Sequence, residues 1–172
     1  MQQKEVHFSA IKLVGLKTAF TNNATEMSDW QNGKIYPCVV RYFHEKLAET
    51  IQNRKKPGTT FCVYRDYESD HTGEYVYFIG EEVTSFDGVP AGLDTYTVPA
   101  QTYAKFTTDP DMMPAVLKDA WNLIFTLSDR ELGGKRAYLA DFEVYDERAA
   151  DHSKPIVLDI YIGIVPHQGC CS

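Results

Sequence analysis

Tyr138–Glu147 reads Tyr-Leu-Ala-Asp-Phe-Glu-Val-Tyr-Asp-Glu, and the interpretation of the whole chain starts from it. Large apolar and aromatic residues recur at every second position, which is typical of a β-strand whose side chains alternate between two faces. One face is apolar and carries Tyr138, Ala140, Phe142 and Val144. The other face is mixed and carries Leu139, Asp141, Glu143 and Tyr145. The stretch therefore predicts a strand that holds two acids on one face.

A second strand is predicted over Ile156–Val165, where the same alternation returns. Its apolar face carries Ile156, Leu158, Ile160, Ile162 and Ile164. Its mixed face carries Val157, Asp159, Tyr161 and Gly163. Because both strands mix carboxylates with tyrosines on what we take to be the face away from the helices, the pattern predicts a cleft there. The residues expected to share it are Glu143, Tyr145, Asp159 and Tyr161.

The order of elements is predicted to occur twice along the chain. The first half reads as a strand over Val6–Phe20 with a kink or bulge at Gly15, a loop over Thr21–Lys34, a helix over Ile35–Arg54, and a hairpin of Thr59–Tyr67 with Glu74–Thr84. The second half reads as an extended segment over Leu93–Phe106 interrupted at Pro99-Ala100, a helix opened by Asp109-Pro110-Asp111, and the two strands described above.

This order predicts a single α+β domain over residues 1–172, with half-repeats at about 1–88 and 89–172. Each half is a strand–helix–hairpin unit, and pseudo-twofold symmetry would relate the two. The strands would form antiparallel sheets with both helices on one side. The seam between the halves is then the expected place for a ligand cleft.

Composition limits the possible functions. The net charge is −7 and the basic residues are scattered, so direct nucleic-acid binding is not expected. No apolar run reaches the roughly 20 residues that a membrane span needs, and the N-terminus has no signal-peptide core. We therefore expect a cytoplasmic protein without a membrane partner. An acidic chain suits a cationic ligand better than an anionic one.

Motifs for cofactors, metals and nucleophiles are missing from the sequence. It has no glycine-rich phosphate loop followed by Lys-Ser/Thr, no G-x-S-x-G, and no metal-ligand spacing among its histidines and cysteines. Cys38 and Cys62 lie in apolar segments and are expected to be buried, while Cys170 and Cys171 lie in a tail. We predict no cofactor, no metal and no disulfide.

Aromatic residues are the unusual resource of this chain, with eleven tyrosines, nine phenylalanines and two tryptophans. Aromatic walls bind flat cations through their π-faces. A carboxylate inside such walls is costly to bury alone, and a cationic ligand or a tyrosine hydroxyl offsets that cost. Glu143 is the best candidate for this carboxylate. The other predicted site residues are Tyr64, Tyr77, Tyr145, Tyr161, Asp159 and, as a cover, Trp30; Trp121 fits core packing of the second helix better.

Four segments in series resemble the GyrI-like, AraC-type effector-binding domain. They are Thr60–Val83, Val98–Phe106, Asp141–Tyr145 and Leu158–Val165. The resemblance implies the duplicated fold and a pocket at the seam, in which the glutamate of the Phe-Glu-x-Tyr strand, here Glu143, recognises cationic lipophilic drugs. Relatives are often the C-terminal half of a transcription activator. Since few residues precede the first strand here, we expect a stand-alone member, of the kind also encoded by mobile integron gene cassettes.

Three functions remain open from the sequence. The first is binding or sequestration of a cationic amphipathic small molecule, with a separate protein partner or a homodimer as possible assemblies. The second, which leaves enzymatic activity undecided, is hydrolysis of a reactive small molecule by Glu143 and tyrosines. The third is a protein-interaction module such as the gyrase-inhibiting relatives.

Overall fold

A computed structural model describes residues 1–167, in which nine strands form one antiparallel sheet. The strands are β1 (Gln2–Phe8), β2 (Ile11–Lys17), β3 (Thr60–Arg65), β4 (Val76–Glu82), β5 (Asp94–Val98), β6 (Gln101–Thr107), β7 (Gly134–Arg136), β8 (Ala140–Tyr145) and β9 (Asp159–Pro166). Eight of them follow the order β1-β6-β9-β8-β3-β4-β2-β5, and β7 pairs with β9. Cys170 and Cys171 lie outside the described residues.

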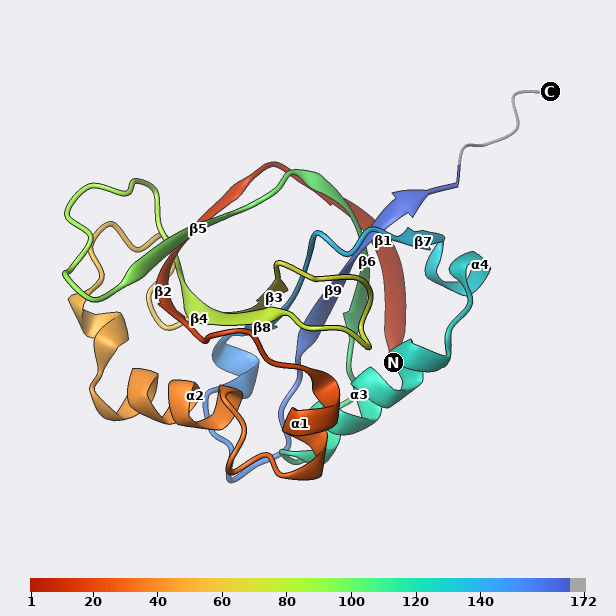
Figure 1. The fold of residues 1–172 in the computed structure, drawn as a ribbon, viewed down its shortest axis with the longest axis horizontal. Coiled ribbons are helices and arrows are strands. Elements are labelled where there is room, and N and C mark those ends of the chain that lie inside the picture. Colours follow the sequence, from red (N-terminus) through yellow and green to blue (C-terminus); the bar gives the residue numbers. More distant parts are fainter. Residues whose placement is uncertain (168–172) are drawn as a thin grey trace.

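Both ends of the sheet belong to one long two-stranded segment, in which β1 and β2 run beside β6 and β5. We call this segment the ribbon. Only Ser9 and Ala10 separate β1 from β2, and only Pro99 and Ala100 separate β5 from β6. β1 pairs with β6 over its full length, and β2 pairs with β5 over residues 11–15, so these bent segments run beside each other on both sides of the bend. The ribbon arches over the rest of the sheet, which curls around an interior (Figure 1).

The strand order is the same from either end of the sheet when the two halves of the chain are exchanged. If β1, β2, β3 and β4 of the first half are exchanged for β5, β6, β8 and β9 of the second, the same order results, read from the other end. β3 and β8 pair at the centre, where the halves meet. The two strands predicted to close each half, β3 with β4 and β8 with β9, are antiparallel neighbours. The α+β class with antiparallel strands is confirmed.

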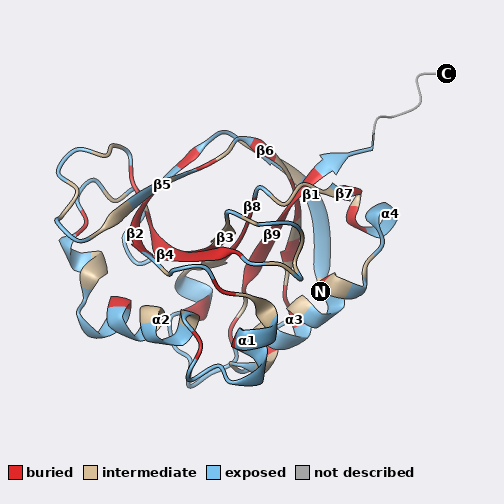
Figure 2. Ribbon diagram, in the orientation of Figure 1, coloured by how far each residue is buried: buried red, intermediate tan, exposed pale blue. Residues whose placement is uncertain are grey.

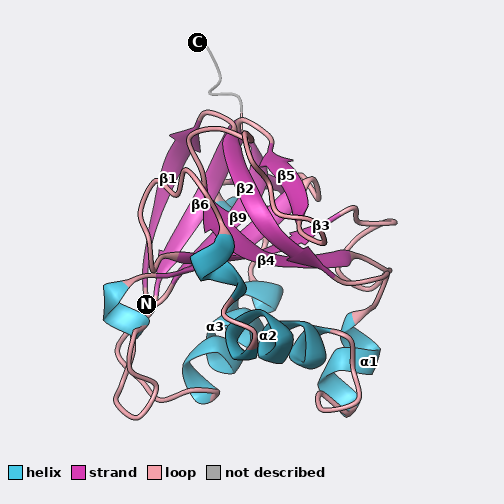
Figure 3. Ribbon diagram, turned by 90° about the vertical axis from the view of Figure 1, so that its left-hand side faces the viewer, coloured by secondary structure: helices cyan, strands magenta, loops and turns pink. Residues whose placement is uncertain are grey.

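The helices lie on one side of the sheet, as predicted (Figure 3). They are α1 (Asn23–Ser28), α2 (Ile35–His44), α3 (Ala115–Thr126) and α4 (Asp129–Leu132), with short 3₁₀ turns at Leu47–Thr50 and Glu147–Ala149. The apolar face of α2 packs on a cluster around Cys62 and Ile79, and that of α3 packs on a cluster around Phe106 and Ile160. No helix in the described part of the chain is long and apolar enough to cross a membrane.

Two of the predicted helical boundaries are wrong. The first helix was expected to reach Arg54, but it ends at His44 because Lys46 adopts a left-handed backbone conformation with φ of 52°. The second was expected to open at Asp109–Asp111, and it begins only at Ala115. The register of apolar residues was right in both cases, since Val39 and Ala120 pack against the sheet.

The segment Thr21–Lys34, predicted as a loop, contains the six-residue α1. Asn22 caps the helix by accepting a hydrogen bond from the Thr25 amide. The buried Glu26 carboxylate accepts from the Thr21 hydroxyl at 2.6 Å and from the Lys34 amide at 2.8 Å. These longer-range hydrogen bonds hold a helix too short for apolar periodicity to reveal it.

The predicted kink or bulge at Gly15 is also wrong. β2 keeps an unbroken register with β4 from Leu13 to Lys17, and the break in the first strand falls at Ser9-Ala10 instead. Gly15 lies opposite Gly80. A Cβ at Gly15 would come within 2.6 Å of the Gly80 Cα and closer still to the Ile79 carbonyl oxygen. The glycine pair therefore permits a close approach of two strand backbones.

Buried residues concentrate in the central strands of the sheet (Figure 2). The interior under the ribbon holds an aromatic cluster that includes Phe61, Phe78, Tyr103, Phe142 and Tyr161. The helix side holds three smaller clusters along α2, α3 and the chain after β8. The central strands thus have two buried faces with different chemistry.

We predict that Gly15→Ala lowers the free energy of unfolding by about 1–3 kcal/mol, because the added methyl group forces the β2 and β4 backbones apart. Urea denaturation followed by circular dichroism measures this. Lys17→Ala, at an exposed position of the same strand, is the matched control and should change the free energy by less than about 0.5 kcal/mol. Equal stability of both variants would contradict the close-approach explanation.

Candidate functional site

Glu143 lies on the helix side of the central strand β8. Phe142 and Val144 point into the sheet interior, so the alternation of the strand sends Glu143 to the opposite face. Its partners across the neighbouring strands are Cys62 of β3 and Ile160 of β9. The side chain is 1% exposed.

Three uncharged groups donate hydrogen bonds to the Glu143 carboxylate. The Tyr64 hydroxyl and the Trp121 indole Nε1 donate to Oε2, at 2.7 Å and 2.9 Å. The Tyr145 hydroxyl donates to Oε1 at 2.8 Å. The donors come from β3, α3 and β8, so the acid ties the middle of the sheet to the helix above it.

The rings around this carboxylate form one connected cluster with Tyr64 at its centre. The Tyr64 ring meets those of Trp121, Tyr77 and Tyr75 edge-on, with centroids 5.2, 5.4 and 5.5 Å away. Such tilted contacts are the preferred geometry of packed aromatic rings. We refer to Glu143, Tyr64, Tyr77, Tyr145 and Trp121 as the Glu143 cluster.

Among the described residues Glu143 has no cationic partner, a property that it shares with the buried Glu26 but not with Asp141 or Glu81. Asp141 pairs with Arg136 at 2.7 Å, and Glu81 pairs with Arg54 at 3.4 Å. No ion pair within residues 1–167 reaches Glu143. Its charge is therefore balanced only by hydrogen-bond dipoles.

Burial controls protonation in the cluster. It raises the pKa of Glu143 above the usual 4.5, although the hydrogen bonds from Tyr64, Trp121 and Tyr145 act in the opposite direction. Burial, followed by the nearby Glu143 charge, raises the pKa of both Tyr64 and Tyr145 well above 10. Both phenols therefore remain protonated donors while the carboxyl group is the one that can change charge.

The structure brings together four of the predicted site residues, namely Glu143, Tyr145, Tyr64 and Tyr77. It adds Trp121, for which core packing was the favoured prediction. Trp121 does pack against the buried cluster between α3 and the sheet, and its indole N–H also donates to Glu143. No signal in the sequence predicted this contact, because Glu143 was expected on the face away from the helices.

The predicted grouping of Tyr161 and Asp159 with Glu143 is wrong. In the β8–β9 register Tyr161 lies opposite Phe142 and Asp159 lies opposite Val144. Cross-strand partners share a face, so Tyr161 and Asp159 face the interior, away from Glu143. The prediction that Glu143 lies on the face away from the helices is also wrong, because Trp121 of α3 donates a hydrogen bond to its carboxylate.

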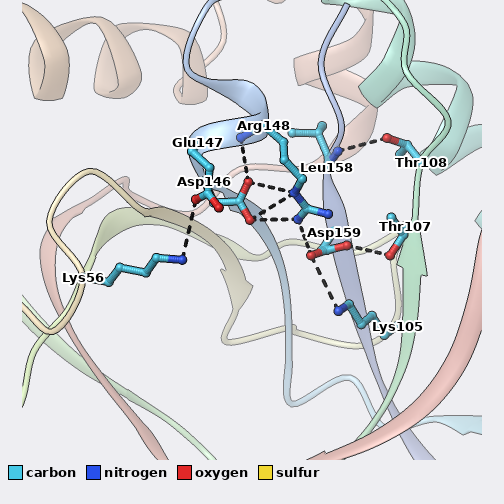
Figure 4. A network of polar contacts seen from close by, with 9 residues as sticks. All are labelled: Lys56, Lys105, Thr107, Thr108, Asp146, Glu147, Arg148, Leu158 and Asp159. Carbon is cyan, nitrogen blue, oxygen red and sulfur yellow. Dashed lines mark hydrogen bonds and ion pairs between the residues drawn. The ribbon is translucent and has the colours of Figure 1, made fainter.

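Asp159 belongs to a separate polar network (Figure 4). Its carboxylate lies 2.6 Å from the Arg148 guanidinium and 3.7 Å from the Lys105 ammonium, and it accepts a hydrogen bond from the Thr107 hydroxyl at 2.6 Å. Arg148 also pairs with Asp146 at 2.8 Å. This acid is fully compensated by neighbouring side chains and joins β9 to β6 and to the chain after β8.

Trp30 is not joined to the Glu143 cluster by any hydrogen bond or ring contact in the described residues. It meets the Tyr36 ring edge-on at 4.6 Å and is 54% exposed. Cys62 is buried and Cys38 partly so. Within residues 1–167 no three or more His, Cys, Asp and Glu side chains gather in a way that could hold a metal ion.

Comparison with known proteins gives consistent matches over nearly the whole chain. A family model described as integron-associated effector binding protein matches residues 6–164. The putative transcriptional regulator protein YobU of Bacillus subtilis (strain 168) is 26% identical over 158 residues, which cover 92% of this chain and 94% of that protein.

Two solved structures share the fold. The integron cassette protein VCH_CASS2 from the mobile metagenome of Vibrio cholerae has a TM-score of 0.74 at 22% identity, with 95% of both chains covered. SAV2435, solved bound to tetraphenylphosphonium, has a TM-score of 0.75 at 15% identity, with 96% of this chain and 94% of that chain covered. Together with the family match, which spans both halves of the sheet and their helices, these likenesses confirm the expected resemblance to effector-binding domains: the chain belongs to the family of integron-associated effector binding proteins.

Proposed function

We propose that the protein binds a cationic, lipophilic, aromatic small molecule at the Glu143 cluster. The observation that carries the proposal is a buried carboxylate held by three uncharged donors without a cation. A ligand that brings its own positive charge would supply the missing counter-ion. Tyr64, Tyr77, Tyr145 and Trp121 would form the walls around it.

The physical gain from such a ligand has two parts. A buried, unpaired carboxylate is unfavourable, and pairing it with a cation away from water offsets that cost. The aromatic rings around the acid add cation–π contacts worth about 0.5–2 kcal/mol each, more where water is excluded. An uncharged ligand of the same shape would gain only from apolar contact. The site would therefore select for charge as well as for aromatic surface.

Binding at this site requires the cluster to open, since Glu143 is 1% exposed. Trp121 is the donor carried by a helix, whereas Tyr64 and Tyr145 are fixed in the sheet. Displacing the indole would free one lone pair of Oε2 and leave the two phenols in place. We expect the ligand cation to take the position of the Trp121 N–H, while the phenols continue to orient the carboxylate.

The fold relative SAV2435 supports this choice of ligand, since it was solved with tetraphenylphosphonium, a cation that carries four phenyl rings. The family description, an effector binding protein, supports a small-molecule role. For the present chain the Glu143 cluster offers both features that such an ion needs, an acid without a cationic partner and several aromatic walls.

We predict that Glu143→Gln weakens binding of tetraphenylphosphonium at least tenfold, or about 1.4 kcal/mol. The amide has the shape of the acid but not its charge, so the loss reports the electrostatic part of binding. Isothermal titration calorimetry at neutral pH measures both affinities.

Asp159→Asn is the matched control for that titration, because it makes the same acid-to-amide change on the other face of the sheet. Its affinity should stay within about twofold of the wild type, a difference of roughly 0.4 kcal/mol. Triphenylphosphine oxide, which is aromatic but uncharged, should bind the wild type more weakly than the cation does. Equal loss in both variants, or no loss in Glu143→Gln, would count against the proposed site.

We predict that affinity for tetraphenylphosphonium rises as the pH is raised from 4.5 upward and then levels off. The charge of the ligand does not depend on pH, so a change in affinity with pH reflects the titration of a group of the protein. Burial raises the pKa of Glu143 above 4.5, and below that raised value the carboxyl group is neutral and attracts the cation less. Affinity is thus gained as pH rises through the folded-state pKa.

Calorimetric titrations at a series of pH values test this, with Glu143→Gln as the reference that cannot titrate. The variant should show a flat profile over the interval in which the wild type changes. A wild-type profile as flat as that of the variant would mean that Glu143 does not supply the negative charge that attracts the ligand.

A further inference from the structure

A recess lies on the face of the central strands opposite to Glu143. Its volume is about 440 Å³, within the range of roughly 300–1,000 Å³ that small-molecule sites occupy. It opens between the bend of the long ribbon at Ser9-Ala10 and the strands β3, β8 and β9. The apolar and aromatic side chains that line it are Phe8, Ile11, Phe61, Phe142, Val144 and Tyr161.

This recess is separated from the Glu143 cluster by the thickness of the sheet. Phe142 and Val144 line it, and they flank Glu143 along β8, so their side chains lie on the opposite face. Tyr161 lies opposite Phe142 in the β8–β9 register and joins the same face. A ligand held here would not touch the Glu143 carboxylate.

The walls of the recess are fixed aromatic surfaces. The rings of Phe142 and Tyr161 stack with centroids 4.6 Å apart and planes 18° from parallel. The ring centroids of Phe8 and Tyr161 are 5.3 Å apart, and those of Phe61 and Phe142 are 5.8 Å apart. Phe61, Phe142 and Tyr161 are each less than 9% exposed, so their positions are set by packing before any ligand arrives. Preformed walls reduce the entropy lost on binding.

The recess is lined by one cation and one acid, Lys55 and Glu82, and by His7. Lys55 and Glu82 face one another across 3.5 Å. The backbone amide of Lys55 also donates to the Glu82 carbonyl at 2.9 Å, which anchors the segment that carries the cation to β4. In contrast to the Glu143 cluster, the lining thus presents a carboxylate that already has its cation, and it selects for neither sign of charge.

Tyr161, one of the lining residues, carries a phenolic hydroxyl group. No hydrogen bond among residues 1–167 engages it, although Tyr161 is 7% exposed. Burial and the neighbouring Asp159 raise the pKa of this phenol to about 12. At neutral pH the hydroxyl is therefore a donor, suited to a ligand that carries a hydrogen-bond acceptor.

We infer that this recess is a second binding site, for a flat, uncharged aromatic molecule with a hydrogen-bond acceptor. Size, aromatic walls, the pairing of Lys55 with Glu82 and the Tyr161 hydroxyl all favour that class of ligand over the cation proposed for the Glu143 cluster. The two sites share the strand β8 but use opposite faces of it.

The probe for the test is 6-propionyl-2-dimethylaminonaphthalene, a flat, uncharged dye with a carbonyl acceptor whose emission shifts to the blue in apolar surroundings. We expect saturable binding to the wild type. Ala10→Trp should weaken it at least tenfold, because Ala10 is exposed at the bend that lines the recess and a larger side chain fills the opening. Tyr161→Phe, which keeps the ring and removes the hydroxyl, should weaken it by roughly two- to tenfold.

Two controls separate this site from the other. Ala150→Trp makes the same change at an exposed position outside the lining and should bind the dye as the wild type does. Glu143→Gln, or an excess of tetraphenylphosphonium, should leave dye binding unchanged, so the result does not depend on the cation site. Circular dichroism shows whether each variant is folded. If Ala10→Trp does not fold, the dye affinity of Tyr161→Phe is the test of the recess.

The inference is overturned by any of three results. The wild type shows no saturable dye binding, or the folded recess variants bind as tightly as Ala150→Trp. In the third, dye binding is lost in Glu143→Gln or on addition of tetraphenylphosphonium, which would place the dye on the helix side of the sheet.

Discussion

The carboxylate of Glu143, buried without a counter-ion where β3 and β8 join the two halves of the sheet, is the constraint on which the site depends. A charge in such a place must be balanced, and the chain provides only three uncharged donors. Two donors are strand tyrosines that hold the acid in position. The third is Trp121 of α3, so the acid also helps to set how that helix lies on the sheet. Because burial raises the pKa of Glu143, binding of a proton is the alternative to binding of a cation as a way to neutralise the carboxylate.

The same alternation of side chains that places Glu143 under the helices gives the sheet a second, different buried face. Phe142 and Val144 turn inward on either side of the acid and meet Tyr161 across the β8–β9 pair. The ribbon formed by β1–β2 and β5–β6 encloses that face (Figure 1). One central strand therefore carries a buried carboxylate without a cation on one side and an aromatic recess on the other. For a member of a family of effector binding proteins, this separation would allow two chemically unlike ligands to be bound without competition.

Much of the fold followed from local sequence patterns. The period-two alternation located β8 and β9, the punctuation by Pro99 located the β5–β6 bend, and the repeated order of elements predicted the antiparallel α+β sheet with helices on one side. The choice of Glu143, with Tyr64, Tyr77 and Tyr145 as its neighbours, also followed from the sequence, and the structure gathers these four residues.

What the sequence did not reveal depends on registers and long-range contacts. Alternation within a strand does not say which residue of the next strand lies opposite, and the observed pairing of Phe142 with Tyr161 sends Tyr161 and Asp159 to the other face. The role of Trp121 depends on where α3 crosses the sheet. The helix α1 depends on hydrogen bonds from Glu26 to segments on both sides of it, which no local period encodes.

The most direct test of the central claim is the pKa of Glu143 itself, measured by carbon NMR of the side-chain carboxyl in protein labelled at glutamate. Glu143→Gln identifies the resonance by its disappearance. The account predicts a pKa above the usual 4.5 in the free protein, and a lower pKa once tetraphenylphosphonium is bound, because a neighbouring cation favours the ionised form. A free-protein pKa at or below 4.5, or one that the bound cation leaves unchanged, would contradict it.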